Sequence, residues 1–264
     1  MKNTVRTIRK MKQEGEKIAV VTAYDAPGAR LAAAAGVDMI LVGDSLAQGA
    51  LGYADTLPVT MEDMLHHAAA VRRGAPEAFV VGDMPFLSYN LSLEQAVRNA
   101  GRFIQEAGCD AVKLESDMTV LPAVKRIVEC GIPVMAHVGL LPQSLKTAGG
   151  YHVAGRSDAE AKALIATAQA MQNAGAFSVV LECVPAKLSG EITRALAVPT
   201  IGIGAGPECD GQVLVCSDVL GLFDGKQPKH AKRYAEIGQM MHQAFADYVD
   251  EVKNGTFPTA ENSF

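Results

Sequence analysis

The sequence predicts a single (β/α)8 barrel, a TIM barrel, over residues 1–264 with an extra N-terminal helix. Three observations predict this fold. The length of 264 residues is usual for one such domain. The hydrophobic content of 49% is enough to bury a large core. A unit made of a helix-like stretch, a glycine, and a short apolar run that ends in a polar residue recurs along the chain, and no linker or low-complexity segment interrupts it.

Five helix-like stretches each stop at a glycine. They cover residues 28–35, 61–73, 93–107, 119–130 and 157–174, and they stop at Gly36, Gly74, Gly108, Gly131 and Gly175. Glycine suits the position after a helix because the left-handed conformation costs it little. Two helix starts fit capping boxes, Ser92 with Gln95 and Ser157 with Glu160.

The apolar runs are rich in Val and Ile and do not alternate strictly with polar residues, which is typical of strands buried on both faces. With three further runs they give eight expected strands: 18–24, 39–44, 78–84, 111–115, 132–138, 178–183, 199–204 and 212–217. Because helices alternate with these strands, a closed parallel barrel is favoured over an open doubly wound sheet. The dinucleotide-type glycine fingerprint, which would favour the open sheet, does not follow the first strand. Residues 1–14 and 229–252 are the expected first and last helices.

Composition excludes several classes of function. The formal net charge of −5, the absence of a basic run and the absence of tryptophan argue against nucleic-acid binding. No apolar stretch approaches the roughly 20 residues that span a bilayer, and the polar N-terminus lacks the apolar segment of a signal peptide. The five cysteines include no C-x-x-C pair, which argues against a disulfide framework or a structural zinc site. We expect a cytoplasmic protein without membrane association.

Charged side chains stand at the predicted ends of successive strands: Asp44, Asp83, Glu115, His137 and Glu182. The C-terminal strand ends of such a barrel carry its catalytic groups. Lys113 lies two residues before Glu115, so both side chains share one face of a strand. Converging carboxylates repel one another, and positive charge must compensate. Lys113 supplies part of it, and a hard divalent cation such as Mg²⁺, which prefers oxygen ligands, would supply the rest.

Other interpretations compete at single positions. One acidic residue at a strand end is usually a helix cap or part of a surface salt bridge, but five in successive units favour a shared site. His137 is either a site residue or a satisfied core histidine. Cys183 is a packed thiol rather than a nucleophile, because no oriented histidine partner is evident. The run IGIGAG (201–206) is either a phosphate-binding turn or a tight strand that needs small residues.

Ordered motifs along nearly the whole chain resemble the ketopantoate hydroxymethyltransferase family. They are VTAYD (21–25), VGDSL (42–46), GYADTLPVT (52–60), HHAAAVRRGAP (66–76), DMPF (83–86), VKLE (112–115), AHVGLLPQS (136–144), GGYHVAGR (149–156), VLECVP (180–185) and IGIGAG (201–206). So many matches in order are specific, whereas VGDS or IGIGAG alone would not be. The sequence departs from the family pattern at Ala47, Ala54-Asp55, His152 and Asn262. These positions flank the core set of site residues and bear on loop shape and kinetics more than on reaction type.

The resemblance implies a (β/α)8 barrel that moves a hydroxymethyl group from 5,10-methylenetetrahydrofolate to 3-methyl-2-oxobutanoate, giving 2-dehydropantoate in pantothenate biosynthesis. It implies Mg²⁺ as cofactor, the 2-oxo acid and the folate as small-molecule partners, and a large homo-oligomer. The implied metal ligands are Asp44 and Asp83, with Glu115 in or just behind the coordination shell, and the implied proton acceptor is Glu182. The implied substrate-binding residues are Asp44, Ser45, Asp83, Lys113 and His137.

Two rival functions stay open from the sequence. Residues 21–45 also resemble the Mg²⁺-dependent lyases and mutases of the phosphoenolpyruvate mutase and isocitrate lyase type, which act on related oxo acids. The reactive-cysteine loop of those lyases, such as KKCGH, is absent here. A barrel that binds a metabolite without turnover is the other rival. The charged set argues against it, because buried charges that do no chemistry cost several kcal/mol each.

Overall fold

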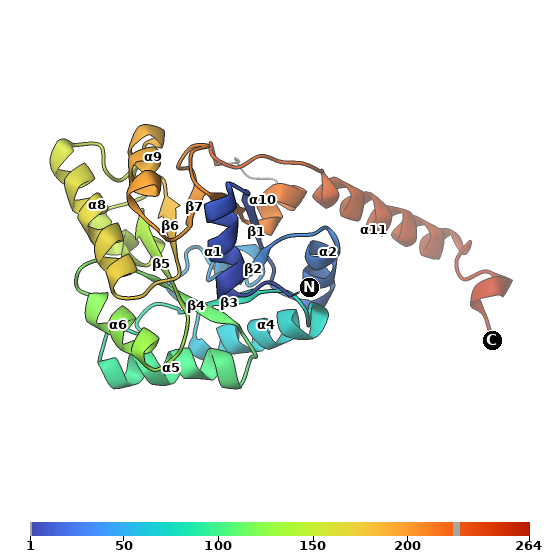
Figure 1. Ribbon diagram of the computed structural model, residues 1–264. Coiled ribbons are helices and arrows are strands. Elements are labelled where there is room, and N and C mark those ends of the chain that lie inside the picture. The colour runs from blue at the N-terminus through green and yellow to red at the C-terminus, as the bar shows by residue number, and fades with distance from the viewer. Residues whose placement is uncertain (1, 224–227) are drawn as a thin grey trace. The chain divides into compact units, whose positions relative to one another are not determined.

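The computed structural model describes residues 2–223 and 228–264 and divides the chain into two compact units, Met1–Leu214 and Val215–Phe264. The first unit is a closed barrel of parallel strands that pair in chain order, β1 to β8, with β8 returning to β1 (Figure 1). This confirms the expected barrel. That the whole of 1–264 acts as one domain stays a prediction.

All eight expected strands are present. They are β1 (Ile18–Thr22), β2 (Met39–Val42), β3 (Val80–Asp83), β4 (Ala111–Glu115), β5 (Val134–Gly139), β6 (Ser178–Glu182), β7 (Thr200–Ile203) and β8 (Gly211–Leu214). The last strand is shorter than expected, because a helix begins at Cys216 where the sequence predicted strand to residue 217.

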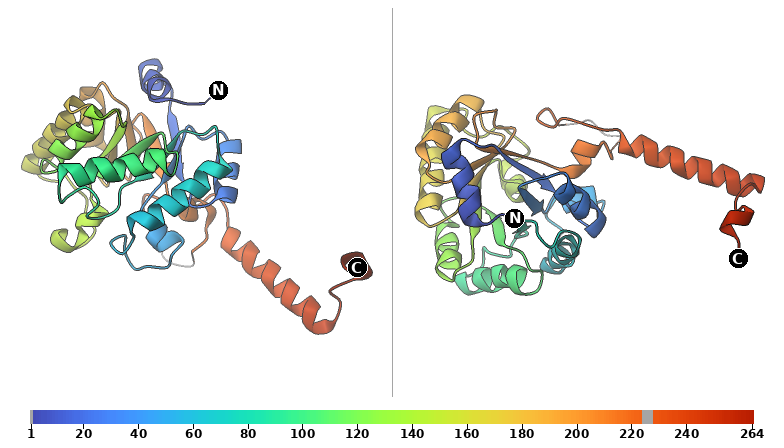
Figure 2. Two further views of the ribbon diagram at one scale, coloured as in Figure 1. Left: turned by 90° about the horizontal axis from the view of Figure 1, so that it is seen from below. Right: turned by 45° about the vertical axis from the view of Figure 1, so that its right-hand side comes forward.

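The helices that follow the strands surround the barrel (Figure 2). They are α2 (Ala26–Ala34), α3 (Leu46–Gly49), α4 (Met61–Gly74), α5 (Leu93–Gln105), α6 (Leu121–Glu129), α7 (Leu145–Ala148), α8 (Asp158–Asn173) and α9 (Ala186–Ala195), with a 3₁₀ turn η1 (Pro142–Ser144) before α7. Their apolar faces pack on strands that are buried almost throughout, as expected for a sheet covered by helices.

The predicted helix caps are confirmed with two corrections. Ser157 and Glu160 form the expected capping box, but at Ser92 only half of the box exists, because the Gln95 side chain does not return the bond. Four of the five glycines that follow helices are left-handed. Gly74 is the exception, since it is the last residue of α4 and does not have a positive φ. A Cβ there would lie 2.1 Å from the carbonyl oxygen of Ala26, so close helix packing explains this glycine.

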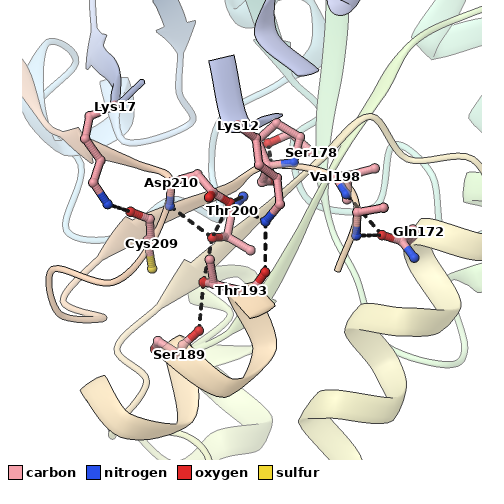
Figure 3. A network of polar contacts seen from close by, with 12 residues as sticks. Lys12, Lys17, Gln172, Ser178, Ser189, Thr193, Val198, Thr200, Cys209 and Asp210 are labelled. Carbon is pink, nitrogen blue, oxygen red and sulfur yellow. Dashed lines mark hydrogen bonds and ion pairs between the residues drawn. The ribbon is translucent and has the colours of Figure 1, made fainter. Parts of the chain in front are cut away.

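The extra N-terminal helix is confirmed as α1 (Val5–Glu14) and lies across the N-terminal end of the barrel (Figure 2). Its Ile8 and Met11 are buried in one cluster with side chains of the barrel interior. Asp210 stabilises the same end by accepting hydrogen bonds from Lys12 Nζ at 2.7 Å and the backbone N–H of Thr200 at 2.8 Å (Figure 3). The charged residues at the N-terminal end of the barrel therefore stabilise the fold. Catalytic residues are expected at the opposite, C-terminal end.

The second unit contains α10 (Cys216–Leu220), α11 (Ile237–Asn254) and the 3₁₀ turn η2 (Ala260–Asn262). The expected last helix is confirmed, although it begins at residue 237 rather than 229. None of its residues is buried. No helix among the described residues is long and apolar enough to cross a membrane.

Candidate active site

The C-terminal ends of β2 to β6 bring the charged residues predicted from the sequence together. The strand register places Asp83 beside Lys113, Glu115 beside His137, and Gly139 beside Glu182. Gly139 has a φ of 106°, and a Cβ there would lie 2.2 Å from the carbonyl oxygen of Glu182, so only glycine allows β5 and β6 to approach this closely. Of the charged residues, only Glu182 keeps appreciable exposure, 17% of its side chain.

Asp83 and Lys113 form a buried ion pair. Lys113 Nζ lies 2.8 Å from Asp83 Oδ1, and the backbone N–H of Asp44 donates to Asp83 Oδ2 at 2.9 Å. Burial raises the pKa of Asp83 to about 7 despite the ammonium beside it. Burial acts to lower the pKa of Lys113, but Asp83 and Asp44 outweigh that effect and raise it, so the ammonium keeps its charge.

His137 lies between Lys113 and Glu182. Its Nε2 is 3.0 Å from Glu182 Oε2, and its Nδ1 is 3.4 Å from Lys113 Nζ. Burial and the Lys113 charge lower the pKa of His137, so the ring is neutral near pH 7. An ammonium offers only donors, so Nδ1 must accept, and the ring proton sits on Nε2 facing the carboxylate. His137 therefore belongs to the charged cluster and is not an isolated core histidine.

Glu115 is the most perturbed carboxyl of the cluster. Burial, and then repulsion by Asp44, raise its pKa to about 9. Its Oε1 accepts the backbone N–H of Gln143 at 2.9 Å, whereas its buried Oε2 has no hydrogen-bond partner among the described residues. A buried carboxyl oxygen without a hydrogen-bond partner is unusual, and this one can accept a bond from a ligand.

Ser45 follows Asp44 and points toward a tyrosine that the sequence analysis missed. Its Oγ lies 2.9 Å from Tyr24 Oη, and Thr22 Oγ1 donates to the same phenol at 3.0 Å. Thr22 and Tyr24 lie two residues apart at the end of β1, which is the same spacing that indicated the Lys113 and Glu115 pair. The same two-residue spacing would have identified Tyr24 as a candidate site residue if the prediction had included neutral side chains as well as charged ones.

Gln143 and Tyr89 were missed as well. Gln143 is the turn residue after β5 and donates through Nε2 to Asp44 Oδ2 at 2.9 Å, while Tyr89 Oη donates to Gln143 Oε1 at 2.6 Å. Burial, and then the charge of Glu115, raise the pKa of Tyr89, so its phenol keeps its proton. The sequence prediction considered only titratable residues at strand ends, so it did not include Gln143, a neutral amide in a 3₁₀ turn.

A family model for ketopantoate hydroxymethyltransferase matches residues 2–260. The chain belongs to this family. Curated relatives named 3-methyl-2-oxobutanoate hydroxymethyltransferase agree: the protein of Moorella thermoacetica is 56% identical over 99% of this chain and 97% of its own length. The protein of Clostridium novyi is 53% identical over 100% of this chain and 96% of its own length.

Solved structures give the wider fold family. A 2,3-dimethylmalate lyase, a member of the phosphoenolpyruvate mutase and isocitrate lyase superfamily, superimposes with a TM-score of 0.62. The match covers 100% of this chain and 92% of the lyase chain, but only 18% of the aligned residues are identical. The resemblance of residues 21–45 to this superfamily therefore extends to the fold of the whole barrel. At 18% identity it shows a shared fold and does not indicate a shared reaction.

The cluster suits a hard divalent cation in donor chemistry and charge. Asp44, Asp83 and Glu115 outnumber the one ammonium, and their oxygens are the ligand type that Mg²⁺ prefers. The buried Oε2 of Glu115 has no hydrogen-bond partner among the described residues, so it is available to a ligand. In residues 2–223 and 228–264, no three carboxylate, imidazole or thiol groups stand as a preformed metal cluster. The residues thus fit such an ion, but their side chains are not already gathered around one point.

Two other positions with competing interpretations fit simple packing. Burial, and then the charge of Glu182, raise the pKa of Cys183 to about 11, which makes it a poor nucleophile and agrees with the expected packed thiol. In the glycine-rich run, a Cβ on Gly206 would lie 2.5 Å from the Cβ of Ala186, and one on Gly202 would lie 3.0 Å from Cys209 Sγ. Close packing therefore explains these two glycines.

The raised carboxyl pKa values make the stability of the cation-free protein depend on pH. Asp83 and Glu115 have folded-state pKa values of about 7 and about 9, above the roughly 4 of an unfolded chain. The folded state binds more protons between these limits, so the free energy of unfolding should fall as the pH rises from about 5 to about 9. Urea denaturation in EDTA across this range measures the slope, and Glu115→Gln should flatten it. A stability that stays level or rises in the wild type would contradict the assignment.

Proposed function

We propose that this protein transfers a hydroxymethyl group from 5,10-methylenetetrahydrofolate to 3-methyl-2-oxobutanoate, giving 2-dehydropantoate in pantothenate biosynthesis. The observation that carries the proposal is the buried chain of contacts from Asp83 through Lys113 and His137 to Glu182, in a protein 53% to 56% identical to curated relatives of that name. This chain of contacts joins a proton acceptor, Glu182, to a positively charged group, Lys113, at the mouth of the barrel.

Asp44 and Asp83 are the proposed ligands of Mg²⁺, and Glu115 lies in the shell or just behind it. The donor set and the unpartnered Oε2 of Glu115 support this assignment. When bound, the cation polarises the keto group of the oxo acid and so makes the neighbouring C3–H bond more acidic. The same two aspartates, with Ser45, then border the position of the 2-oxo acid.

Glu182 is the proposed general base. Its Oε2 lies 3.0 Å from Nε2 of His137, and its Oε1 is the proposed acceptor of the substrate proton. The C3–H bond breaks, the proton passes to Glu182 Oε1, and the electron pair forms the enolate. His137 cannot take this proton at Nε2, because that nitrogen already carries one. Its role is to hold the carboxylate toward C3 and to contact the oxo acid.

Lys113 supplies fixed positive charge beside the oxygen that becomes negative as the enolate forms. Because Asp83 holds the ammonium at 2.8 Å, the charge is in place before the reaction begins. Water releases the one-carbon unit from the folate: the two C–N bonds of the methylene carbon break, water gives its oxygen to that carbon, and its two protons go to the nitrogens of the departing tetrahydrofolate. The enolate carbon bonds to this carbonyl carbon, and the oxygen that becomes the product hydroxyl takes the proton held by Glu182.

The proposal also includes a large homo-oligomer in the cytoplasm, acting as one domain. Support for the oligomer comes from α11, whose apolar side chains are 42% to 66% exposed: Met240, Met241, Phe245, Tyr248, Val249 and Val252. An apolar face of this kind is typical of a surface that packs against another chain. The free cysteines among the described residues suit a reducing compartment.

The test is an assay with 3-methyl-2-oxobutanoate, 5,10-methylenetetrahydrofolate and Mg²⁺, with 2-dehydropantoate measured by mass spectrometry. We expect product only when the folate is present. Cleavage of branched malates or phosphonates without folate would support the lyase or mutase alternative instead. Absence of both product and Mg²⁺-dependent C3 exchange would support a barrel that binds without turnover.

Asp83→Ala should weaken cation and oxo-acid binding together, each by about tenfold or more, because both depend on the same carboxylate. Calorimetry with Mg²⁺ alone, and then with the oxo acid at saturating Mg²⁺, measures the two affinities. Asp158→Ala on the exposed face of α8 is the matched control. An unchanged Mg²⁺ affinity in Asp83→Ala would remove this residue from the ligand set.

A further inference from the structure

Gln143 uses both N–H donors and the oxygen of its side-chain amide inside the acidic cluster. Its Nε2 donates to Asp44 Oδ2 at 2.9 Å and to the carbonyl oxygen of Met84 at 3.0 Å. Its Oε1 accepts the phenol of Tyr89 at 2.6 Å, and its backbone N–H donates to Glu115 Oε1 at 2.9 Å. The residue is 5% exposed, so water does not compete for these positions.

These contacts define the orientation of the amide. Both partners of Nε2 are acceptors, because Met84 offers a carbonyl oxygen and Asp44 a carboxylate oxygen. A flipped amide would place its own oxygen against both of them. The oxygen of Gln143 must therefore face Tyr89, and the buried phenol, which is 4% exposed, must be its donor.

Gln143 occupies one oxygen on each of two carboxylates from different strands. Asp44 is bound through Oδ2 and Glu115 through Oε1, so Asp44 Oδ1 and Glu115 Oε2 are left for other partners. The donors are the side-chain amide of Gln143 for Asp44 and its backbone N–H for Glu115, and neither group carries a charge. The two acidic groups, which repel each other, are thereby kept together in one orientation.

We propose that Gln143, oriented by Tyr89, is a positioning residue that presents one defined oxygen of Asp44 and one of Glu115 to the divalent cation. The inference rests on the proposed cation site and adds two residues to it. Neither touches the reacting atoms. Partners of this kind act by restricting the ligands, and their loss typically costs 10- to 100-fold in metal affinity.

The proposal predicts a change in cation preference as well as in affinity. Mg²⁺ requires near-ideal octahedral geometry, whereas Ca²⁺ accepts irregular and flexible sites. Loosened carboxylates should therefore penalise Mg²⁺ more than Ca²⁺. A purely structural role for Gln143 would weaken both ions equally or neither, so the ratio of the two affinities separates the roles.

Two variants test this. Gln143→Met keeps the side-chain length and the backbone bond to Glu115 but removes the bonds to Asp44 and Tyr89. Tyr89→Phe removes one hydroxyl and should fold even if Gln143→Met does not. Ser178→Ala is the matched control, because it removes one buried hydroxyl and its 3.0 Å bond to the carbonyl of Pro199 at the opposite end of the barrel (Figure 3).

Calorimetry of the whole 264-residue chain with Mg²⁺ alone and Ca²⁺ alone measures the two dissociation constants. We expect the Mg²⁺ Kd to rise about 10- to 100-fold in both variants, the Ca²⁺ Kd to change less than about threefold, and neither to change in Ser178→Ala. Mg²⁺ affinity within twofold of wild type in Tyr89→Phe, or equal losses for both ions, would overturn the inference while leaving the cation site intact. A wild-type protein that binds no Mg²⁺ would overturn the inference together with the proposed site.

Discussion

Glu182→Gln should bind the oxo acid as the wild type does and lose the exchange of its C3 hydrogen with solvent. Glutamine matches glutamate in shape, and its amide oxygen can occupy the position of the carboxylate oxygen 3.0 Å from His137 Nε2. It cannot take a proton from carbon, so the general base is missing. We expect the exchange rate to fall by roughly 10²- to 10⁴-fold. Proton NMR in D₂O with Mg²⁺ and 3-methyl-2-oxobutanoate, without folate, follows this step alone.

The matched control is Glu106→Gln, which alters an exposed glutamate just after α5 that pairs with Arg102 at 2.8 Å. It should exchange C3 at the wild-type rate. Glu182→Gln must also keep its affinity for the oxo acid, which calorimetry measures. Exchange within a few-fold of wild type in Glu182→Gln would remove this residue from its role, and a loss of oxo-acid binding would make it a binding residue instead.

The fold was predictable because its signals are local. A buried parallel strand needs a run of Val and Ile, and a helix that turns back toward the next strand ends well at glycine, so each β/α unit can be recognised by itself. The prediction was wrong at positions where contacts between distant parts of the chain, rather than local sequence, determine the structure. Gly74 is required by the close approach of Ala26, which no local pattern reveals. The last strand gave way to α10 because apolar residues near its end suit either element.

The charged part of the site was predictable for a related reason. Strand ends meet at one mouth in a barrel, so Asp83, Lys113 and Glu182 could be gathered without knowing the packing. Gln143 lies in the 3₁₀ turn η1, and Tyr89 lies in the loop before α5. Their importance comes from the hydrogen bond of Gln143 to Asp44, far away in the sequence, and from the bond of Tyr89 to Gln143. A neutral side chain has no chemistry of its own that would mark it, so only the folded structure identifies it.

The contacts of His137 link the two halves of the site. Its protonation pattern is set by Lys113 on one side, and that pattern places the ring proton on Nε2, which lies 3.0 Å from Glu182 on the other. The ammonium therefore influences the base through the ring as well as through its charge. Removal of the ammonium should affect stability, the state of the carboxyl groups and the rate of C3 exchange at once.

Lys113→Met should produce these three effects. The ammonium is 6% exposed and lies 2.8 Å from Asp83, so its loss leaves the buried carboxylate of Asp83 unpaired. Breaking such a pair costs about 3–5 kcal/mol, and we expect this loss in the free energy of unfolding at pH 8 without Mg²⁺. Lys113 holds down the pKa values of Asp83 and Glu115, so both rise in the variant. The groups are then neutral at pH 6, and the loss should be smaller there.

C3 exchange in Lys113→Met should fall by roughly 10²- to 10³-fold, because the fixed positive charge beside the developing oxyanion is gone. Lys12→Met is the control, since it breaks a 2.7 Å pair with Asp210 at the other end of the same barrel. That variant should lose stability to a similar extent at pH 6 and pH 8 and keep its exchange rate. Equal stability losses at the two pH values in Lys113→Met, or exchange within twofold of wild type, would show that the ammonium only fills space. Smaller losses at pH 6 together with slow exchange would show that one charge both holds the acidic groups together and stabilises the enolate.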